Sequence, residues 1–176
     1  MMTDASYPIG KFEKQDAYTQ EEIQQNIAFI DILPDTLSAA IAGLNEDQMN
    51  TPYREGGWTV NQVIHHLADS HMNAFIRTKL MITEDNPTIV PYMQAEWAEL
   101  PDSVETDPEI SLSLLTMLHH RWVMLLRSLK PEDMSKTYVH PEYGQSYTVA
   151  QVIALYAWHS KHHTAHITTL RYLKGW

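Results

Sequence analysis

Four stretches of the sequence repeat their apolar residues with the period of an α-helix, and no stretch shows convincing strand alternation. They lie at about residues 20–44, 59–83, 108–129 and 148–173. A chain of 176 residues is about the size of one ordinary domain, long enough to bury its apolar surface around a single core. We therefore predict one all-α domain over residues 1–176.

The ends of these stretches carry recognisable helix signals. Thr59 and Thr148 each precede a glutamine by three residues, Gln62 and Gln151, which is typical of a capping box at a helix start. The two starts, TVNQVI and TVAQVI, reflect either an old duplication of a helix pair or convergence on a good helix start. Pro34 lies inside the first stretch and predicts a kink there.

The connection between the second and third stretches, residues 85–107, is long and rich in proline, glutamate and aromatic residues. A connection of this length lets the chain cross a bundle and begin the next helix at the other end. It forms either a wall or lid of a pocket or simply a packed crossover.

Composition excludes several classes of protein. The net charge is −10 with only 12 Lys and Arg, which argues against nucleic acid and anionic membrane surfaces as partners. The chain has no cysteine, which excludes disulfides, thiolate ligands and a cysteine nucleophile. Residues 1–10 have neither the basic start nor the apolar stretch of a signal peptide. No apolar run approaches the roughly 20 residues of a membrane span. We expect a cytoplasmic protein.

Ten histidines in an acidic chain without cysteine indicate a metal site. Imidazole is the commonest protein ligand for zinc, nickel and related ions. The histidines gather in the second, third and fourth helical stretches and in one loop: His65, His66, His71, His119, His120, His140, His159, His162, His163 and His166.

The fourth stretch offers two pairs spaced four residues apart, and such pairs project from one face of a helix. At about 100° per residue, His159 and His163 lie within or beside the apolar face, whereas His162 and His166 turn toward its flank. A buried imidazole needs a partner, and a metal ion supplies one. We favour His159 and His163 as ligands; the alternative is a pair of core histidines hydrogen-bonded to neighbouring helices.

The second stretch is less decisive. The same geometry places His71 at the centre of the apolar face and His66 on its flank, beside Ser70, Asn73 and Arg77. Periodicity alone favours His71 as the third ligand.

Several motifs, in order along nearly the whole chain, are similar to those of a known family. They are YPIG at 7–10, TPYR at 51–54, GGWTV at 56–60, HHLADSHMN at 65–73, HxRW at 119–122, HP at 140–141, WHS at 158–160, His163 and AHI at 165–167. The sequence resembles the YfiT group of the DinB superfamily.

This resemblance implies a four-helix bundle, usually homodimeric, with a long crossover between its second and third helices. It also implies one divalent metal ion per chain, zinc or nickel, on three histidines. The ligands correspond to His66, His159 and His163, so the resemblance replaces His71 by His66. Other histidines are then candidates for orienting a ligand ring or lining the pocket: His71, His162 and His166.

Three histidine ligands leave a coordination position open, as at catalytic metals. The resemblance implies an enzyme that acts on a small molecule, and we expect activation of a low-molecular-weight thiol, such as bacillithiol, for transfer to an electrophile. The alternative is hydrolysis by a metal-bound water, which usually needs a carboxylate base; the nearest in sequence, Asp69, points away from the core. A further alternative is a non-catalytic metal-binding stress protein.

Two other groups of side chains have two interpretations each. The arginines bind an anionic thiol or substrate, or they pair with the many acidic side chains. The tryptophans line a pocket or fill the core. These residues are Arg54, Arg77 and Arg121, and Trp97, Trp122 and Trp158.

Overall fold

The computed structural model describes residues 5–142 and 144–176, so the first four residues of the N-terminal segment considered above lie outside it. The long helices are α1 (Gln20–Asp31), α2 (Leu33–Ile41), α4 (Val60–Thr83), α7 (Pro108–Ser128) and α8 (Val149–Lys174). The short elements are α3 (Glu46–Met49), α5 (Gln94–Trp97), α6 (Pro101–Val104), the 3-10 helix η1 (Pro131–Ser135), and strands β1 (Thr137–His140) and β2 (Gln145–Thr148). Among the described residues, no helix is both long and apolar enough to cross a membrane.

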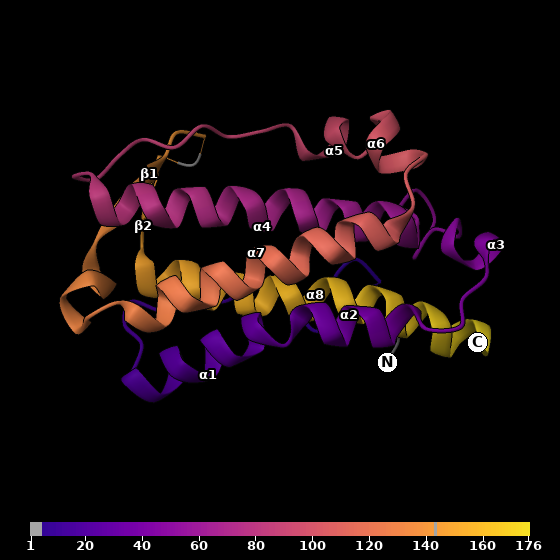
Figure 1. Cartoon of the computed structure of the whole chain (residues 1–176), viewed down its shortest axis with the longest axis horizontal. Coiled ribbons are helices and arrows are strands. Elements are labelled where there is room, and N and C mark those ends of the chain that lie inside the picture. Colours follow the sequence, from indigo (N-terminus) through magenta and orange to yellow (C-terminus); the bar gives the residue numbers. More distant parts are fainter. Residues whose placement is uncertain (1–4, 143) are drawn as a thin grey trace.

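The long helices form the predicted four-helix bundle, in which α1 and α2 together make one of the four rods (Figure 1). After α4 the chain runs back along the outside of the bundle, through α5 and α6, before α7 begins. As a result α4 and α7 run in the same direction, and they pack against each other along their length (Figure 1). The predicted crossover is confirmed, and its short helices α5 and α6 are an addition that the sequence pattern did not indicate.

The first rod breaks where its proline predicts. The α1 helix ends at Asp31, Ile32 caps both helices, and Pro34 occupies the first turn of α2. Proline is tolerated in a first turn, where its missing N–H has no helical partner to lose. The periodic stretch 20–44 is therefore two helices.

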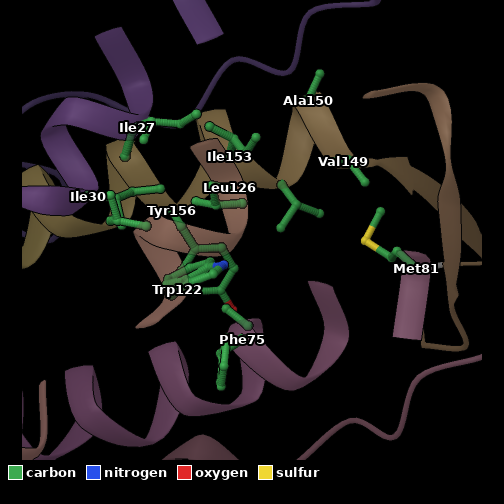
Figure 2. Close-up of a cluster of buried hydrophobic side chains, with 14 of the residues drawn as sticks. Ile27, Ile30, Phe75, Met81, Trp122, Leu126, Val149, Ala150, Ile153 and Tyr156 are labelled. Atoms are coloured by element: carbon green, nitrogen blue, oxygen red, sulfur yellow. The ribbon is translucent and has the colours of Figure 1, made fainter. Parts of the chain in front are cut away.

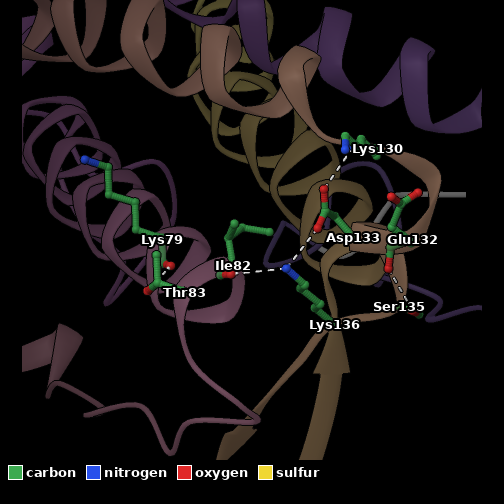
Figure 3. A network of polar contacts seen from close by, with 8 residues as sticks. All are labelled: Lys79, Ile82, Thr83, Lys130, Glu132, Asp133, Ser135 and Lys136. Carbon is green, nitrogen blue, oxygen red and sulfur yellow. Dashed lines mark hydrogen bonds and ion pairs between the residues drawn. The ribbon is translucent and has the colours of Figure 1, made fainter.

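A small antiparallel hairpin, β1 with β2, precedes α8 and was not predicted. Its strands have four residues each, too short for apolar alternation to stand out. The segment before it is fixed to the end of α4: the Lys136 ammonium donates to the Ile82 carbonyl at 3.1 Å and pairs with Asp133 at 2.9 Å (Figure 3). This network sets the point from which α8 starts.

The apolar core is divided into two clusters. One surrounds the fully buried Trp122, with Phe75, Ile153 and Tyr156 among its members (Figure 2). The other contains the early part of α4 and the late part of α8. Histidines lie within or close to the junction of the two clusters along each helix: His66 and His71 on α4, His119 on α7, and His159, His162, His163 and His166 on α8. All of these except the partly exposed His159 are buried. A layer of imidazoles therefore crosses the middle of the bundle.

Candidate metal centre

The helices α4 and α8 position the three predicted ligands. Each begins at a threonine whose hydroxyl accepts from the backbone of a glutamine three residues on, while the glutamine side chain accepts from the threonine N–H. These are the predicted capping boxes, at Thr59 and Thr148. Because the helix starts are fixed, the faces that carry His66 on α4 and His159 with His163 on α8 are fixed as well.

The structure brings His66, His159 and His163 together. Each offers one ring nitrogen, and these nitrogens all lie within 4.8 Å of one another. The Nε2 atoms of His66 and His159 are 3.3 Å apart. Two nitrogens on one tetrahedral zinc ion, each about 2.0–2.1 Å from the metal, lie about 3.3 Å apart. The spacing therefore fits a shared divalent ion.

The protonation of these imidazoles fits a metal as well. Burial, together with the nearby His162 and His166, lowers the pKa of His66 to about 4. Burial and neighbouring imidazoles hold the pKa values of His159 and His163 well below the usual value. A metal binds only the unprotonated ring. At neutral pH all three rings are therefore neutral and ready to bind one.

A chain of hydrogen bonds through the core fixes which nitrogen of His159 is bare. The His119 Nδ1 lies 2.7 Å from the Ile30 carbonyl, which can only accept, so this nitrogen donates. The remaining His119 Nε2 accepts from His71 Nδ1 at 2.9 Å. The His71 Nε2 accepts in turn from His159 Nδ1 at 3.2 Å. Neutral rings leave one consistent set of tautomers, in which His159 presents a bare Nε2 to His66.

His71 is thus fully buried, as its central position on the helix predicts, but both of its nitrogens are used within the core. It is a hydrogen-bond partner of the predicted ligand His159 and lies outside the three-histidine group. The choice of His71 as a ligand from periodicity alone is therefore not supported. Its hydrogen bond to His159 fits the role of orienting a ligand ring, for which the resemblance leaves His71 as a candidate.

His65, the other member of the histidine pair on α4, faces away from this group. Its Nε2 donates to the Thr106 carbonyl at 3.1 Å, and its Nδ1 accepts from the Ser111 hydroxyl at 2.8 Å. It attaches the start of α7 to α4. Adjacent residues on a helix point about 100° apart, so only one of the pair can reach the centre.

A cavity of about 450 Å³ opens beside the three histidines. Aromatic rings and imidazoles form most of its wall: His166 stacks on Tyr53 with ring centres 3.9 Å apart, and His162 stacks on Trp158 at 4.4 Å. No aspartate or glutamate of the described residues lines it. Its lining residues are Ser6, Tyr7, Tyr53, Arg54, Gly56, Gly57, Trp58, His66, Gln94, Trp158, His159, His162, His163 and His166.

A tight loop between α3 and α4 supplies part of this wall. The Tyr53 N–H donates to the Trp58 carbonyl at 3.0 Å and closes the loop. A Cβ on Gly57 would lie 2.8 Å from Cγ of Arg54, so only glycine allows this approach. Trp58 packs at 4.5 Å from His66, between ring centres. In the sequence, Trp58 stands out only as part of the GGWTV motif at 56–60.

Comparison with known proteins identifies the family. The sequence profile of the DinB superfamily matches residues 30–167. The chain belongs to the DinB superfamily. It is 53% identical over 175 residues to proteins from Bacillus mycoides strain KBAB4 and Bacillus cereus strain B4264 that are named "Putative metal-dependent hydrolase", covering 99% of this chain and all of each relative. The structure of YfiT from Bacillus subtilis superimposes with a TM-score of 0.97 at 44% identity, covering 99% of both chains.

YfiT is described as a probable metal-dependent hydrolase with an unusual four-helix bundle topology. The resemblance inferred from the sequence motifs is thereby confirmed, and so is the fold that it implied. These names agree with a group of three histidines in this DinB-superfamily chain that is spaced to hold one metal ion.

A second group in the DinB chain, His162, His163 and His166, also brings three nitrogens within 4.8 Å. Each of these rings has a buried Nδ1 without a hydrogen-bond partner among the described residues. Burial lowers the pKa values of His162 and His166 to about 4. Both are neutral at physiological pH, so they offer lone pairs to the cavity.

The three candidate arginines lie in different places. Arg54 is exposed at the metal cavity and donates to the Glu55 carbonyl at 2.8 Å. Arg121 is exposed, with its guanidinium 5.4 Å from the centre of the Phe75 ring. Arg77 is buried and donates to a backbone carbonyl. In the described part of the chain none of the three pairs with a carboxylate, which was the alternative interpretation.

The tryptophans divide between the two interpretations. Trp158 lines the metal cavity. Trp122 is a core residue whose indole N–H donates to the Thr78 hydroxyl at 3.1 Å. Trp97 lies at the surface on α5, against Tyr92.

Proposed function

We propose that this protein is a metal-dependent enzyme in which a divalent ion, zinc or nickel, held by His66, His159 and His163 activates the thiol of a low-molecular-weight cosubstrate, such as bacillithiol, for transfer to an electrophile. The observation that carries the proposal is the cavity itself. Three neutral imidazoles converge on it, and none of the residues known to line it, all from 5–142 and 144–176, is a carboxylate.

A bound divalent ion supplies a Lewis acid that lowers the pKa of a thiol or a water toward neutrality. The chain supplies the rest. The hydrogen bonds through His71 and His119 keep His159 in the tautomer that can bind the ion. The aromatic wall formed by Trp58, Trp158 and Tyr53 offers an apolar surface to the electrophile.

The absence of a carboxylate from the described part of the cavity wall favours thiol transfer. Hydrolysis at a metal centre usually needs a carboxylate base to take a proton from water. The candidate from the sequence, Asp69, does not line the cavity; burial and the nearby Asp102 raise its pKa to about 6 under the crossover. In thiol transfer the sulfur forms a bond to the electrophilic carbon as the leaving group departs with the bond's electrons. The thiol proton goes to solvent, so no residue must act as base.

Hydrolysis is the second candidate, because the relatives are named metal-dependent hydrolases. Two neutral imidazoles beside the three-histidine group, His162 and His166, favour it, since each offers a hydrogen-bond acceptor that can orient a water molecule. A non-catalytic metal-binding role is the third. Such a site usually closes the coordination shell with four protein groups, whereas this group has three.

The test uses untagged, metal-loaded protein with a chromogenic electrophile and a panel of low-molecular-weight thiols, alongside ester and amide substrates. We expect conjugation that requires a thiol, is abolished in His66→Ala, and is retained in His120→Ala, a change at an exposed histidine of α7. Ester or amide turnover without thiol would establish the hydrolase instead. Metal binding with neither activity would leave the non-catalytic role.

A further inference from the structure

A second cavity, of about 570 Å³, lies on the other side of His159. It is lined by α4, the crossover, the hairpin and α8, and it shares His159 and Gln94 with the metal cavity. Its volume is in the range of pockets that hold small organic ligands, about 300–1,000 Å³. One of the three candidate ligands, His159, therefore also borders a space that the proposed thiol chemistry does not use.

Arg77 is the cation of this cavity. Its side chain is 9% exposed, and its Nη2 donates to the Val90 carbonyl at 3.0 Å. The guanidinium also lies 5.9 Å from the centre of the Tyr92 ring. A guanidinium has five N–H donors in a planar fork, so this one bond leaves most of them free. A buried charge normally has a partner of opposite sign.

No carboxylate of the described residues supplies that partner. The ion pairs found there are Arg127 with Asp31 and Lys136 with Asp133. Glu96 and Glu142 line the same cavity but are exposed, and neither pairs with Arg77. In a chain this rich in acidic residues, a buried arginine that pairs with none of the described carboxylates indicates an anion from outside.

We infer that this cavity binds the carboxylate end of an extended small molecule whose other end reaches the metal centre, an inference that rests on the proposed function. The guanidinium fork matches a carboxylate with two parallel hydrogen bonds. Arg77 is the only lysine or arginine among the lining residues, which suits a singly charged group better than a doubly charged phosphate. The ligand is the thiol cosubstrate or the electrophile of the proposed reaction.

Helix geometry sets the length of this ligand. Arg77 follows His66 by eleven residues of α4, a rise of about 16 Å, and its long side chain leans back toward the helix start. A molecule that contacts both the metal site at His66 and the guanidinium of Arg77 must therefore span on the order of 10 Å. A compact thiol with its carboxylate two or three bonds away is too short.

The alternative role for Arg77 is structural, because its bond to Val90 attaches the crossover to α4. Loosening the crossover would weaken binding of charged and uncharged ligands alike. An anion site instead discriminates between ligands of equal length that differ only in charge. The ratio of the affinities for a charged and an uncharged ligand of equal length therefore distinguishes an anion-binding role of Arg77 from a structural one.

The experiment uses cobalt-substituted protein, whose thiolate-to-cobalt absorption reports thiol binding. The probes are ω-mercaptoalkanoic acids of increasing chain length and the ω-mercaptoalkanols of equal length. In wild type we expect the acid to bind about tenfold or more tightly than the alcohol, and only for chains long enough to span the two sites. In Arg77→Gln the ratio falls to about one while alcohol binding is unchanged, and Arg121→Gln, an exposed control, keeps the wild-type ratio.

Two results would overturn the inference. One is the same ratio of acid to alcohol affinity in wild type and Arg77→Gln, and the other is a wild-type ratio near one at every chain length of the probes. If Arg77→Gln does not fold, Arg77→Lys provides the same test, with an intermediate ratio expected because lysine keeps the charge but loses the fork. If no thiol of either series reaches the cobalt, the proposed thiol chemistry fails. Alkanoic acids without a thiol then test the carboxylate site alone: they raise the Tm of wild type but not of Arg77→Gln, and no rise in wild type refutes the site.

Discussion

At the scale of single residues, the most deeply buried histidine of α4 is not the one that lies in the three-histidine group. His71 is the most central histidine of α4 and is fully buried, yet its two nitrogens bond to His119 and His159. His66, on the flank by periodicity, is the one that meets His159 and His163. A helical wheel ranks how deeply side chains lie, but it carries no information on which ring nitrogens face one another. Only similarity to a family selected His66.

The hydrogen bond from His159 to His71 predicts a loss of metal affinity when it is removed. In His71→Ala, the His159 Nδ1–H has no partner and the ring can turn or change tautomer. Removing such an orienting partner typically weakens metal binding about 10- to 100-fold. Chelator competition should show this loss with about one ion still bound at saturating metal. An unchanged affinity would contradict the role of His71; His120→Ala is the matched control.

The pKa of His119 predicts acid lability of the metal-free protein. Burial lowers this pKa to about 4, outweighing the hydrogen bond to Ile30 and the charge of Asp31, which raise it. Between pH 6.5 and 4 the unfolded chain binds a proton here that the folded chain does not, so stability present above pH 6.5 is lost as the pH falls toward 4. The contribution is on the order of 3 kcal/mol.

Urea unfolding of metal-free protein across this pH range measures the effect. His119→Gln removes the titrating ring and should show a shallower loss of unfolding free energy with falling pH than wild type. His120→Gln, on the exposed side of the same helix, should follow wild type. Equal slopes for wild type and His119→Gln would be incompatible with this assignment.

At the scale of elements, the sequence predicts what local chemistry determines. The starts of α4 and α8 follow from the threonine and glutamine of their capping boxes, and the break between α1 and α2 follows from Pro34. The hairpin could not be predicted, because its pairing depends on contacts beyond its own short strands. One such contact is the backbone bond from Ile89 of the crossover to Val139 of β1.

The capping box of α8 gives a stability prediction. Thr148→Ala removes the hydroxyl that accepts from the Gln151 N–H at 3.1 Å. Loss of an N-cap side chain typically costs about 1 kcal/mol of unfolding free energy. Thr148→Ser keeps an accepting hydroxyl and should retain most of the wild-type stability in urea unfolding. A serine variant as unstable as the alanine variant would show that the cap is not the cause.

At the scale of the whole molecule, the crossover makes the site. Because the chain returns along the bundle before α7 begins, α4 and α7 run in parallel, and His71 and His119 meet at one level (Figure 1). The imidazole layer then lies where the two apolar clusters adjoin, and burial there lowers the pKa values of its rings and keeps them neutral. The length of the connection 85–107 predicted the crossover, but it could not predict which residues of α4 and α7 lie side by side. The homodimer that the family resemblance implies stays a prediction.

The most direct test of the account is the metal content of the purified, untagged protein, measured by mass spectrometry with His66→Ala, His159→Ala and His120→Ala beside it. We predict about one divalent ion per chain in wild type and in His120→Ala, and its loss in the other two variants. Protein without stoichiometric metal, or metal unaffected by either of those two substitutions, would contradict the three-histidine centre and return these residues to the role of core histidines.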